Sequence, residues 1–352
     1  MDDIREVQKI YDRIPDRQSR MIYSNRMNYS LTGDGHFLTE IVDRTVRSKT
    51  EWNEFCKDLM QKAAEDNMVI FGAGIWGNIL YNETNTFLQW KCMIDSNPKC
   101  KKNGDLPVIP FGEFIENYEG ECIVISSYKN YQDMKKQLCM YNVPDDRIID
   151  AGKVIYQMTE KDMYFDLQEL LPCRELEVFV DAGCFDGATT RRFFEWCNGE
   201  GYSYCLEPDA QNIVSIKKKS EDNKKLEIID KALWSRTTTL SINANGNYAT
   251  SVAELTDHDN SQRVEAIALD DLLTDKEITF IKMDIEGAEA DALRGAKKVI
   301  TKQKPRLAIS IYHKPEDIWT IPQLILEYNP DYTLYLRHYS FSDYDTVLYA
   351  IP

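Results

Sequence analysis

Three carboxylates lie close together in the segment Asp284-Ile-Glu-Gly-Ala-Glu289. Acids packed so closely repel one another unless hydrogen bonds, a cation or water compensate them, and such a cluster is a candidate functional site. Asp284 is one candidate for a general base, and Asp284 and Glu286 are both candidate catalytic residues. They could also hold Mg²⁺, a hard cation that prefers oxygen ligands and lowers the pKa of a bound hydroxyl. The alternative is a pair of helix-start carboxylates stabilised by the helix dipole.

A histidine follows the next apolar run, in the segment Ile311-Tyr-His-Lys. His313 is the first choice for a general base, because the unperturbed pKa of histidine is near neutrality. The alternative is a solvated histidine in a loop or at the start of a helix. Asp284, Glu286 and His313 are therefore the predicted catalytic residues.

A glycine-containing turn, Asp181-Ala-Gly-Cys-Phe-Asp-Gly187, stands between a predicted strand and a predicted helix. We expect Gly183 to let the backbone approach a ligand where a Cβ would collide, and the helix N–H groups after Gly187 to face an anionic group. Glu207 follows about 20 residues later, where a carboxylate accepts hydrogen bonds from both hydroxyls of a ribose. Asp230, after the next strand, is a candidate partner of an adenine amino group. The alternative is a set of solvated strand-end carboxylates in another Rossmann-like protein.

These residues need a parallel sheet, whose strand ends meet at one edge, to bring them together. Apolar runs predict strands at 177–180, 203–206, 226–229, 278–283 and 306–311, with helical patterns between most of them. Two further strands, 332–338 and 346–350, follow each other without a helix between them. The pattern predicts a parallel sheet that ends in an antiparallel hairpin.

The first part of the chain has the same alternation after a helical stretch. Residues 1–65 show apolar spacing typical of helices, and strands are predicted at 68–71, 91–94, 106–109 and 122–125. Gly72, Gly74 and Gly77 form a G-x-G-x-x-G pattern between a strand and a helix, and Asp95 ends the next strand. This arrangement predicts a nucleotide-binding turn, with Asp95 on the ribose.

The alternative for the first part is a Rossmann-like domain that kept its packing glycines and binds nothing. Tyr131 and Lys135 have the Y-x-x-x-K spacing of short-chain reductases. They follow the glycines too closely for that arrangement, so we interpret the pair as chance spacing on a helix.

The motifs Asp181-x-Gly-x-x-x-Gly187, Glu207-Pro and Lys282-Met-Asp-Ile-Glu-Gly-Ala-Glu289 resemble those of FkbM-type methyltransferases, over about residues 178–352. The resemblance implies a class I methyltransferase fold that transfers a methyl group from S-adenosyl-L-methionine to a hydroxyl, often on sugars. It also implies that Asp181, Gly183 and Glu207 bind the donor, while Asp284 and Glu286 lie near the sulfonium and the acceptor. The segment 69–109 resembles the N-terminal nucleotide-binding domain of bacterial sugar acyltransferases, which implies a nucleotide or nucleotide-sugar site.

Composition and charge argue against several classes of protein. The net charge of −16 repels phosphate backbones and argues against a nucleic-acid substrate. No stretch is apolar enough to span a bilayer, and the acidic start is unlike a signal peptide. Nine cysteines without a C-x-x-C pair indicate reduced thiols of a cytoplasmic protein.

We therefore predict two tandem Rossmann-like α/β domains, residues 66–155 and 156–352, behind a helical lead-in of residues 1–65. The predicted activity is S-adenosyl-L-methionine-dependent O-methylation of a sugar, glycan, nucleotide-sugar or related small metabolite by a chain that can form a homo-oligomer. One alternative is a nucleotide-sugar- or NAD-dependent enzyme centred on the first domain. A second is a non-catalytic subunit that binds the donor.

Overall fold

Contacts divide the chain into two compact units. The structure is a computed structural model that describes residues 2–172, 176–220, 223–243, 251–254 and 262–352. The larger unit consists of Met1–Val42 and Met163–Pro352, and the smaller unit is Asp43–Asp162. The sequence analysis instead placed its boundaries after residues 65 and 155.

The predicted helical range 1–65 does contain helices, but they divide between the two units. α1 (Asp2–Asp12) and α2 (Arg17–Thr32) belong to the larger unit, whose core buries Ile10, Ile14 and Ile22. α3 (Gly35–Thr45) crosses the boundary, and α4 (Thr50–Ala63) belongs to the smaller unit. The first two helices are therefore part of the larger domain and not a separate lead-in.

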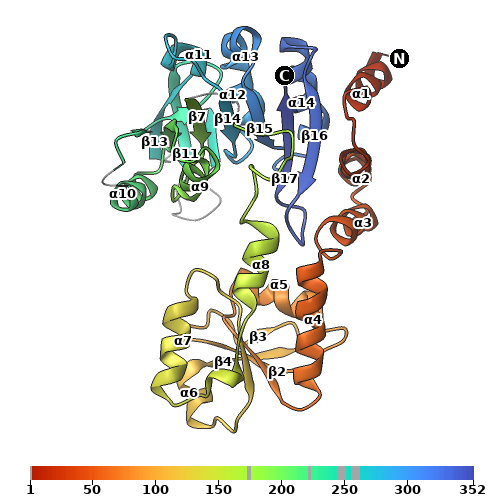
Figure 1. The fold of residues 1–352 in the computed structure, drawn as a ribbon, viewed down its shortest axis with the longest axis vertical. Coiled ribbons are helices and arrows are strands. Elements are labelled where there is room, and N and C mark those ends of the chain that lie inside the picture. Colours follow the sequence, from red (N-terminus) through yellow and green to blue (C-terminus); the bar gives the residue numbers. More distant parts are fainter. Residues whose placement is uncertain (1, 173–175, 221–222, 244–250, 255–261) are drawn as a thin grey trace. The chain divides into compact units, whose positions relative to one another are not determined.

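The larger unit is built on a seven-stranded sheet with the order β16-β17-β15-β14-β7-β8-β9 (Figure 1). Neighbouring strands from β15 to β9 are parallel, whereas β17 is antiparallel to both β15 and β16. This confirms the predicted parallel sheet with a C-terminal hairpin. The strands are β7 (Glu177–Ala182), β8 (Gly201–Leu206), β9 (Leu226–Ile229), β14 (Phe280–Met283), β15 (Arg306–Ser310), β16 (Thr333–His338) and β17 (Thr346–Ile351).

Helices connect these strands largely where the apolar spacing predicted them. Residues 289–303 form two helices and not one, since α12 ends at Gly295, where a Cβ would lie 2.1 Å from the carbonyl oxygen of Trp234. The helices are α9 (Ala188–Trp196), α10 (Ala210–Lys219), α11 (Leu269–Leu272), α12 (Glu289–Arg294), α13 (Lys297–Gln303) and α14 (Asp317–Tyr328).

The N-terminal segment covers the edge strand β16. Leu334 N donates a hydrogen bond of 2.9 Å to Arg13 O, and Leu336 N donates one of 2.8 Å to Ser19 Oγ. Ser19 lies in the first turn of α2, which Asp16 caps by accepting a hydrogen bond from Ser19 N. An uncovered edge strand would offer its backbone groups to other chains, so this contact protects the sheet.

A second, four-stranded sheet with the order β10-β13-β11-β12 lies between β9 and β14 in the sequence. The sequence analysis assigned no strands here, because the longer strands of this sheet mix polar with apolar residues and are not apolar runs. Their bounds are β10 (Ala232–Leu233), β11 (Thr238–Asn243), β12 (Ser251–Glu254) and β13 (Gln262–Ile267).

The smaller unit contains a six-stranded sheet with the order β3-β4-β2-β1-β5-β6, in which only the pair β3–β4 is antiparallel among the described strands. This is the predicted Rossmann-like arrangement. β6 and α8 occupy a stretch that the sequence analysis left as loop and connector. The elements are β1 (Met68–Phe71), α5 (Ile75–Thr84), β2 (Trp90–Asp95), β3 (Lys102–Asn103), β4 (Leu106–Pro110), α6 (Phe111–Glu116), β5 (Cys122–Ile125), α7 (Tyr131–Met140), β6 (Ile148–Asp150) and α8 (Ala151–Thr159).

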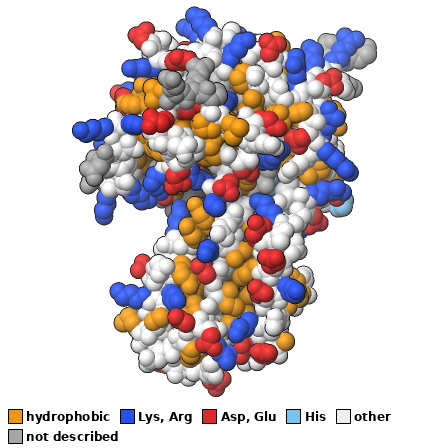
Figure 2. All heavy atoms as spheres, viewed as in Figure 1, with side chains coloured by type: hydrophobic (Ala, Val, Ile, Leu, Met, Phe, Trp, Pro, Cys, Tyr) orange, Lys and Arg blue, Asp and Glu red, His pale blue; other side chains and the backbone are white. Residues whose placement is uncertain are grey.

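Acidic and basic side chains are interspersed on the face of the molecule drawn in Figure 2. The net charge of −16 therefore does not gather there into one acidic field. Among the residues that the structure describes, no helix combines the length and apolar character needed to cross a membrane.

Candidate functional site

The glycine turn, residues 183–187, joins β7 to α9 at the carboxyl edge of the larger sheet. Gly183 and Gly187 both have φ of +73°, a left-handed conformation that favours glycine. A Cβ on Gly183 would lie 1.9 Å from the carbonyl oxygen of Asp284. We predicted that Gly183 admits a ligand, but the close neighbour in the structure is the backbone after β14.

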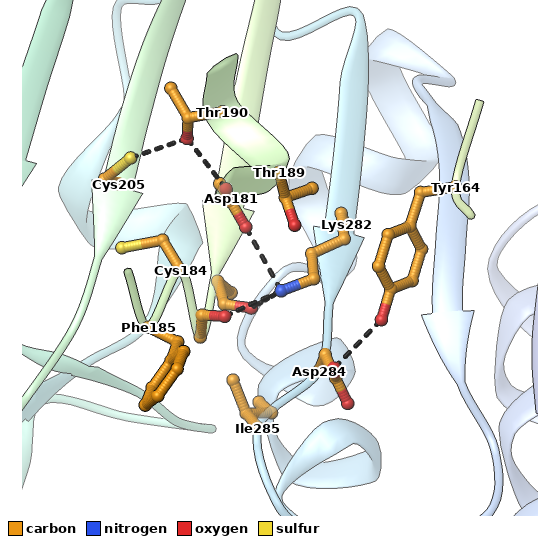
Figure 3. Close-up of polar contacts among 12 residues, drawn as sticks. Tyr164, Asp181, Cys184, Phe185, Thr189, Thr190, Cys205, Lys282, Asp284 and Ile285 are labelled. Atoms are coloured by element: carbon orange, nitrogen blue, oxygen red, sulfur yellow. Dashed lines mark hydrogen bonds and ion pairs between the residues drawn. The ribbon is translucent and has the colours of Figure 1, made fainter. Parts of the chain in front are cut away.

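Asp181, near the end of β7, has no exposed surface. Its Oδ2 accepts a hydrogen bond of 2.7 Å from Thr190 Oγ1, and its Oδ1 lies 3.2 Å from Lys282 Nζ (Figure 3). Both carboxylate oxygens therefore face side chains of the same unit. The predicted direct contact of Asp181 with the donor stays a prediction, and the contact that the structure shows is with Lys282, which also bonds to the glycine turn.

Lys282 lies in β14 and is 2% exposed. Its ammonium donates hydrogen bonds of 3.2 Å to Ala182 O and 2.7 Å to Gly183 O, and it lies 5.4 Å from the centre of the Tyr164 ring. Burial lowers the pKa of this ammonium, but the carboxylates of Asp181 and Asp284 outweigh burial and raise it. A charged lysine thus ties the glycine turn to β14. The sequence analysis gave Lys282 no role, although a lysine inside an apolar strand was a usable signal.

Glu207 follows β8, next to the glycine turn, and is 4% exposed. Its Oε2 accepts a hydrogen bond of 3.0 Å from Phe185 N, and its Oε1 accepts one of 2.9 Å from Asp209 N. Burial raises the pKa of Glu207, although these hydrogen bonds oppose the shift. Asp230 follows β9, the next strand, and is exposed. The structure thus brings Glu207 against the turn and leaves Asp230 open to solvent at the end of the neighbouring strand.

Asp284 follows β14 directly and is held by two tyrosines. Its Oδ2 accepts a hydrogen bond of 2.9 Å from Tyr164 OH, and its Oδ1 accepts one of 3.1 Å from Tyr312 OH. Burial raises the pKa of Asp284, but Lys282, His313 and the tyrosine hydroxyl outweigh it, so the pKa is lowered overall. The carboxylate is therefore ionised and fixed, with 24% of its side chain exposed. Tyr164 comes from a stretch read as a connector, so the sequence analysis missed it.

His313 is surrounded by the three acids of the cluster. Its Nδ1 lies 3.0 Å from Glu289 Oε1, and its Nε2 lies 3.6 Å from Asp284 Oδ1 and 3.5 Å from Glu286 Oε2. Burial lowers the pKa of His313, but these carboxylates raise it to about 9. The imidazole therefore carries two protons at neutral pH and cannot accept another. This argues against the predicted role of His313 as a free general base.

Glu286 lies in the turn between β14 and α12, with a φ of +56° that is unusual for a residue with a side chain. Burial raises its pKa to about 7, and the neighbouring Asp284 and Glu289 carboxylates add to the shift while His313 opposes it. Its side chain is 31% exposed. Glu286 is thus a partly accessible carboxylate that titrates near neutrality.

The residues that could hold a cation differ from the predicted pair. In the described part of the chain, the group whose ligand atoms lie within 4.8 Å of one another comprises Asp284, Glu289 and His313. Glu286, which was predicted to hold Mg²⁺ together with Asp284, is not in that group.

Packing explains Gly72 and Gly77 of the G-x-G-x-x-G pattern but not Gly74. A Cβ on Gly77 would lie 1.9 Å from Gly72 O, and one on Gly72 would lie 2.6 Å from Ser126 Oγ. Gly74, the N-cap of α5, has no described atom within 4 Å of such a Cβ. Asp95 Oδ2 accepts a hydrogen bond of 2.9 Å from Ala73 N in this turn.

Tyr131 and Lys135 of the Y-x-x-x-K spacing lie one turn apart on α7. Lys135 Nζ lies 3.2 Å from Asp145 Oδ1. This contact gives Lys135 a structural partner and agrees with our interpretation of the spacing as chance.

Comparison with known proteins gives a family match and several similar proteins. Residues 181–342 match the methyltransferase FkbM domain. The 2-O-methyltransferase NoeI of Sinorhizobium fredii (strain NBRC 101917 / NGR234) is 25% identical over 147 residues, which are 36% of this chain and 60% of that protein. The chain thus covers less than two thirds of the length of NoeI.

Two solved structures are also similar. Methyltransferase FkbM from Methylobacillus flagellatus KT is 21% identical, with a TM-score of 0.48, over 92% of this chain and 99% of that one. Fibrillarin of Aeropyrum pernix, in complex with natively bound S-adenosyl-L-methionine, is 11% identical, with a TM-score of 0.35, over 51% of this chain and 69% of that one.

Proposed function

Because residues 181–342 form a methyltransferase FkbM domain, we propose that this chain transfers a methyl group from S-adenosyl-L-methionine to a hydroxyl of a sugar, glycan or related small metabolite. The observation that carries the proposal is the packing of the glycine turn against the backbone after β14 at the carboxyl edge of the sheet. There Gly183 packs on the Asp284 backbone, and Glu207 accepts a hydrogen bond from Phe185 N. This packing thus holds the residues proposed to bind the donor next to those proposed to act on the acceptor.

On the donor side, Glu207 is the candidate partner of the ribose hydroxyls. Its Oε1 already accepts hydrogen bonds from Asp209 N and Asn212 Nδ2, whereas its Oε2 accepts one from Phe185 N and keeps acceptor capacity for the ribose. The exposed Asp230, at the end of the next strand, is the candidate partner of the adenine amino group. Lys282 and Asp181 keep the glycine turn in the position that the methionine end of the donor needs.

On the acceptor side, the oxygen of the hydroxyl forms a bond to the methyl carbon while the bond from that carbon to sulfur breaks. The electron pair of the broken bond stays on sulfur, which yields S-adenosylhomocysteine. Glu286 takes the proton of the hydroxyl, since it is accessible and has a pKa of about 7. Asp284, held by Tyr164 and Tyr312, orients the hydroxyl, and much of the rate comes from this alignment.

A hydroxyl acceptor is supported by the name of NoeI, a 2-O-methyltransferase. The sugar class comes from the resemblance of the motifs to FkbM-type enzymes. The net charge of −16 favours a neutral or cationic acceptor over a nucleic acid. Buried thiols such as those of Cys184 and Cys205 suit a reducing compartment, and we place the protein in the cytoplasm.

A second candidate function concerns the smaller unit. Asp95 accepts a hydrogen bond from Ala73 N, just as Glu207 accepts one from Phe185 N in the larger unit. This shared geometry favours a nucleotide or nucleotide-sugar on the turn of Gly72 and Gly74. Calorimetric titration with UDP-sugars and NAD tests it.

The test of the main proposal is methyl transfer from labelled S-adenosyl-L-methionine to a panel of glycans and sugar nucleotides. We expect Asp284→Asn to abolish transfer while it largely spares binding of S-adenosylhomocysteine. Unchanged transfer in this variant would remove Asp284 from the mechanism, and no transfer to any acceptor by the unaltered chain would favour the alternative of a non-catalytic subunit.

A further inference from the structure

A buried imidazole and a buried carboxylate oxygen beside Asp284 have no hydrogen bond to any residue that the structure describes. The side chain of His313 is 8% exposed, and that of Glu289 is 1% exposed. Both ring nitrogens of His313 and Oε2 of Glu289 are without a hydrogen bond within the described ranges, since the 3.0 Å contact between the two residues lacks hydrogen-bond geometry. A buried polar group left without a partner costs about 1–3 kcal/mol. The arrangement therefore favours a ligand that binds these atoms.

The chemistry of this ligand follows from the charges. Three carboxylates surround the single His313 imidazolium, so the cluster keeps a net negative charge, and a cation that displaces a proton of His313 suits it. Asp284, Glu289 and His313 offer ligand atoms that all lie within 4.8 Å of one another. We propose that these three residues bind one divalent transition-metal ion.

The separations suit such an ion. His313 Nδ1 lies 3.0 Å from Glu289 Oε1, and His313 Nε2 lies 3.6 Å from Asp284 Oδ1. Nitrogen and oxygen ligands bound at about 2.0–2.2 Å from a metal lie about 3.0–3.6 Å from each other. These two distances involve different ring nitrogens, of which one ion binds only one, so the remaining carboxylate has to rotate toward the ion. A nitrogen ligand favours Mn²⁺ or Zn²⁺ over Mg²⁺ and Ca²⁺, which take oxygen ligands.

The carboxylates are also oriented as metal ligands usually are, by hydrogen bonds from a second layer of groups. Tyr164 OH and Tyr312 OH donate to the two oxygens of Asp284. Ile285 N donates a hydrogen bond of 2.8 Å to Oε1 of Glu289, the oxygen that lies beside His313 Nδ1, and Oε2 has no hydrogen bond within the described ranges. Each oxygen of Asp284 keeps a lone pair for a metal.

The role of the ion rests on the proposed function. Three protein ligands leave coordination positions open, and Asp284 is the most exposed of the three, with 24% of its side chain accessible. An acceptor hydroxyl bound there would have a lowered pKa.

The experiment titrates Mn²⁺ into the full chain after treatment with a chelator, by calorimetry and electron paramagnetic resonance. We expect one ion per chain and binding at least about tenfold tighter than that of Mg²⁺. Electron spin-echo measurements should show coupling of the bound Mn²⁺ to a histidine nitrogen. His313→Ala and Glu289→Gln should each weaken binding at least about tenfold, while Glu316→Gln, an exposed residue before α14, should not change it.

Absence of binding at millimolar Mn²⁺, or binding without a nitrogen signal, would overturn the proposal. The nitrogen signal is measured on the unaltered chain, so the test holds even if a variant fails to fold. A parallel titration with S-adenosylhomocysteine separates the two proposals. Donor binding without Mn²⁺ binding rejects only the metal site, and Mn²⁺ binding without donor binding rejects only the methyltransferase proposal.

Discussion

Replacing Lys282 with methionine tests the buried ion pair that ties the glycine turn to the sheet. The substitution keeps the length of the side chain but removes the ammonium that lies 3.2 Å from Asp181 and donates to Ala182 O and Gly183 O. Asp181 has no exposed surface, so its carboxylate would stay buried with the hydrogen bond from Thr190 but without the ammonium. Breaking a buried pair in this way costs about 3–5 kcal/mol.

Denaturant unfolding measures how much free energy of unfolding the larger unit loses. The transition of the larger unit is identified as the one that S-adenosylhomocysteine shifts. At about 2–4 °C per kcal/mol, we also expect its midpoint temperature to fall by roughly 6–20 °C. The matched control is Lys297→Met, which removes an exposed pair with Glu327 at 3.5 Å and should cost less than about 1 kcal/mol.

A double-mutant cycle with Asp181→Asn isolates the pair. Because the asparagine carries no charge, Lys282→Met should cost at least about 2 kcal/mol less in that background. Additive losses, or a loss for Lys282→Met no larger than that for Lys297→Met, would refute the reasoning. Donor affinity should fall together with stability, since the same ammonium fixes the turn.

Two further expectations concern the glycine turn and the acid cluster. Gly183→Ala places a Cβ 1.9 Å from Asp284 O at a positive φ and should destabilise the larger unit by at least about 2 kcal/mol. Gly74→Ala places its Cβ in open space and should cost little stability. Equal effects of the two substitutions in calorimetric unfolding would reject the packing argument. The rate of methyl transfer should rise with pH through about 7, because Glu286 is protonated and inactive as a base below its pKa and ionised above it. In Glu286→Gln this limb of the pH–rate profile should vanish, and a profile unchanged by the substitution would exclude Glu286 as the base.

Much of the fold of the larger unit could be predicted from the sequence. Strands such as β7 and β8 are short apolar runs bounded by turns, and buried parallel strands read in that way. The second sheet was not predicted because β11 and β13 mix polar with apolar residues, and because β10 spans only Ala232–Leu233. The association of α1 and α2 with the larger unit was also not predictable, because amphipathic spacing shows that a face is buried and not which sheet buries it.

The candidate site was predictable in its positions but less so in its roles. Strand ends located Asp181, Glu207 and Asp284, since parallel strands present their carboxyl ends at one edge. The contacts between these side chains could not be predicted from the sequence, because Lys282 and Asp181 are neighbours only through the pairing of β14 with β7. The pKa of His313 likewise depends on three acids that the fold places around it.

Calorimetric titration of the chain with S-adenosylhomocysteine tests the central claim, a donor site on the glycine turn, most directly. We expect one molecule bound per chain, and binding at least about tenfold weaker in Glu207→Gln, which loses a charged acceptor for the ribose hydroxyls. Absence of binding at millimolar ligand, or equal affinity in both proteins, would contradict the assignment.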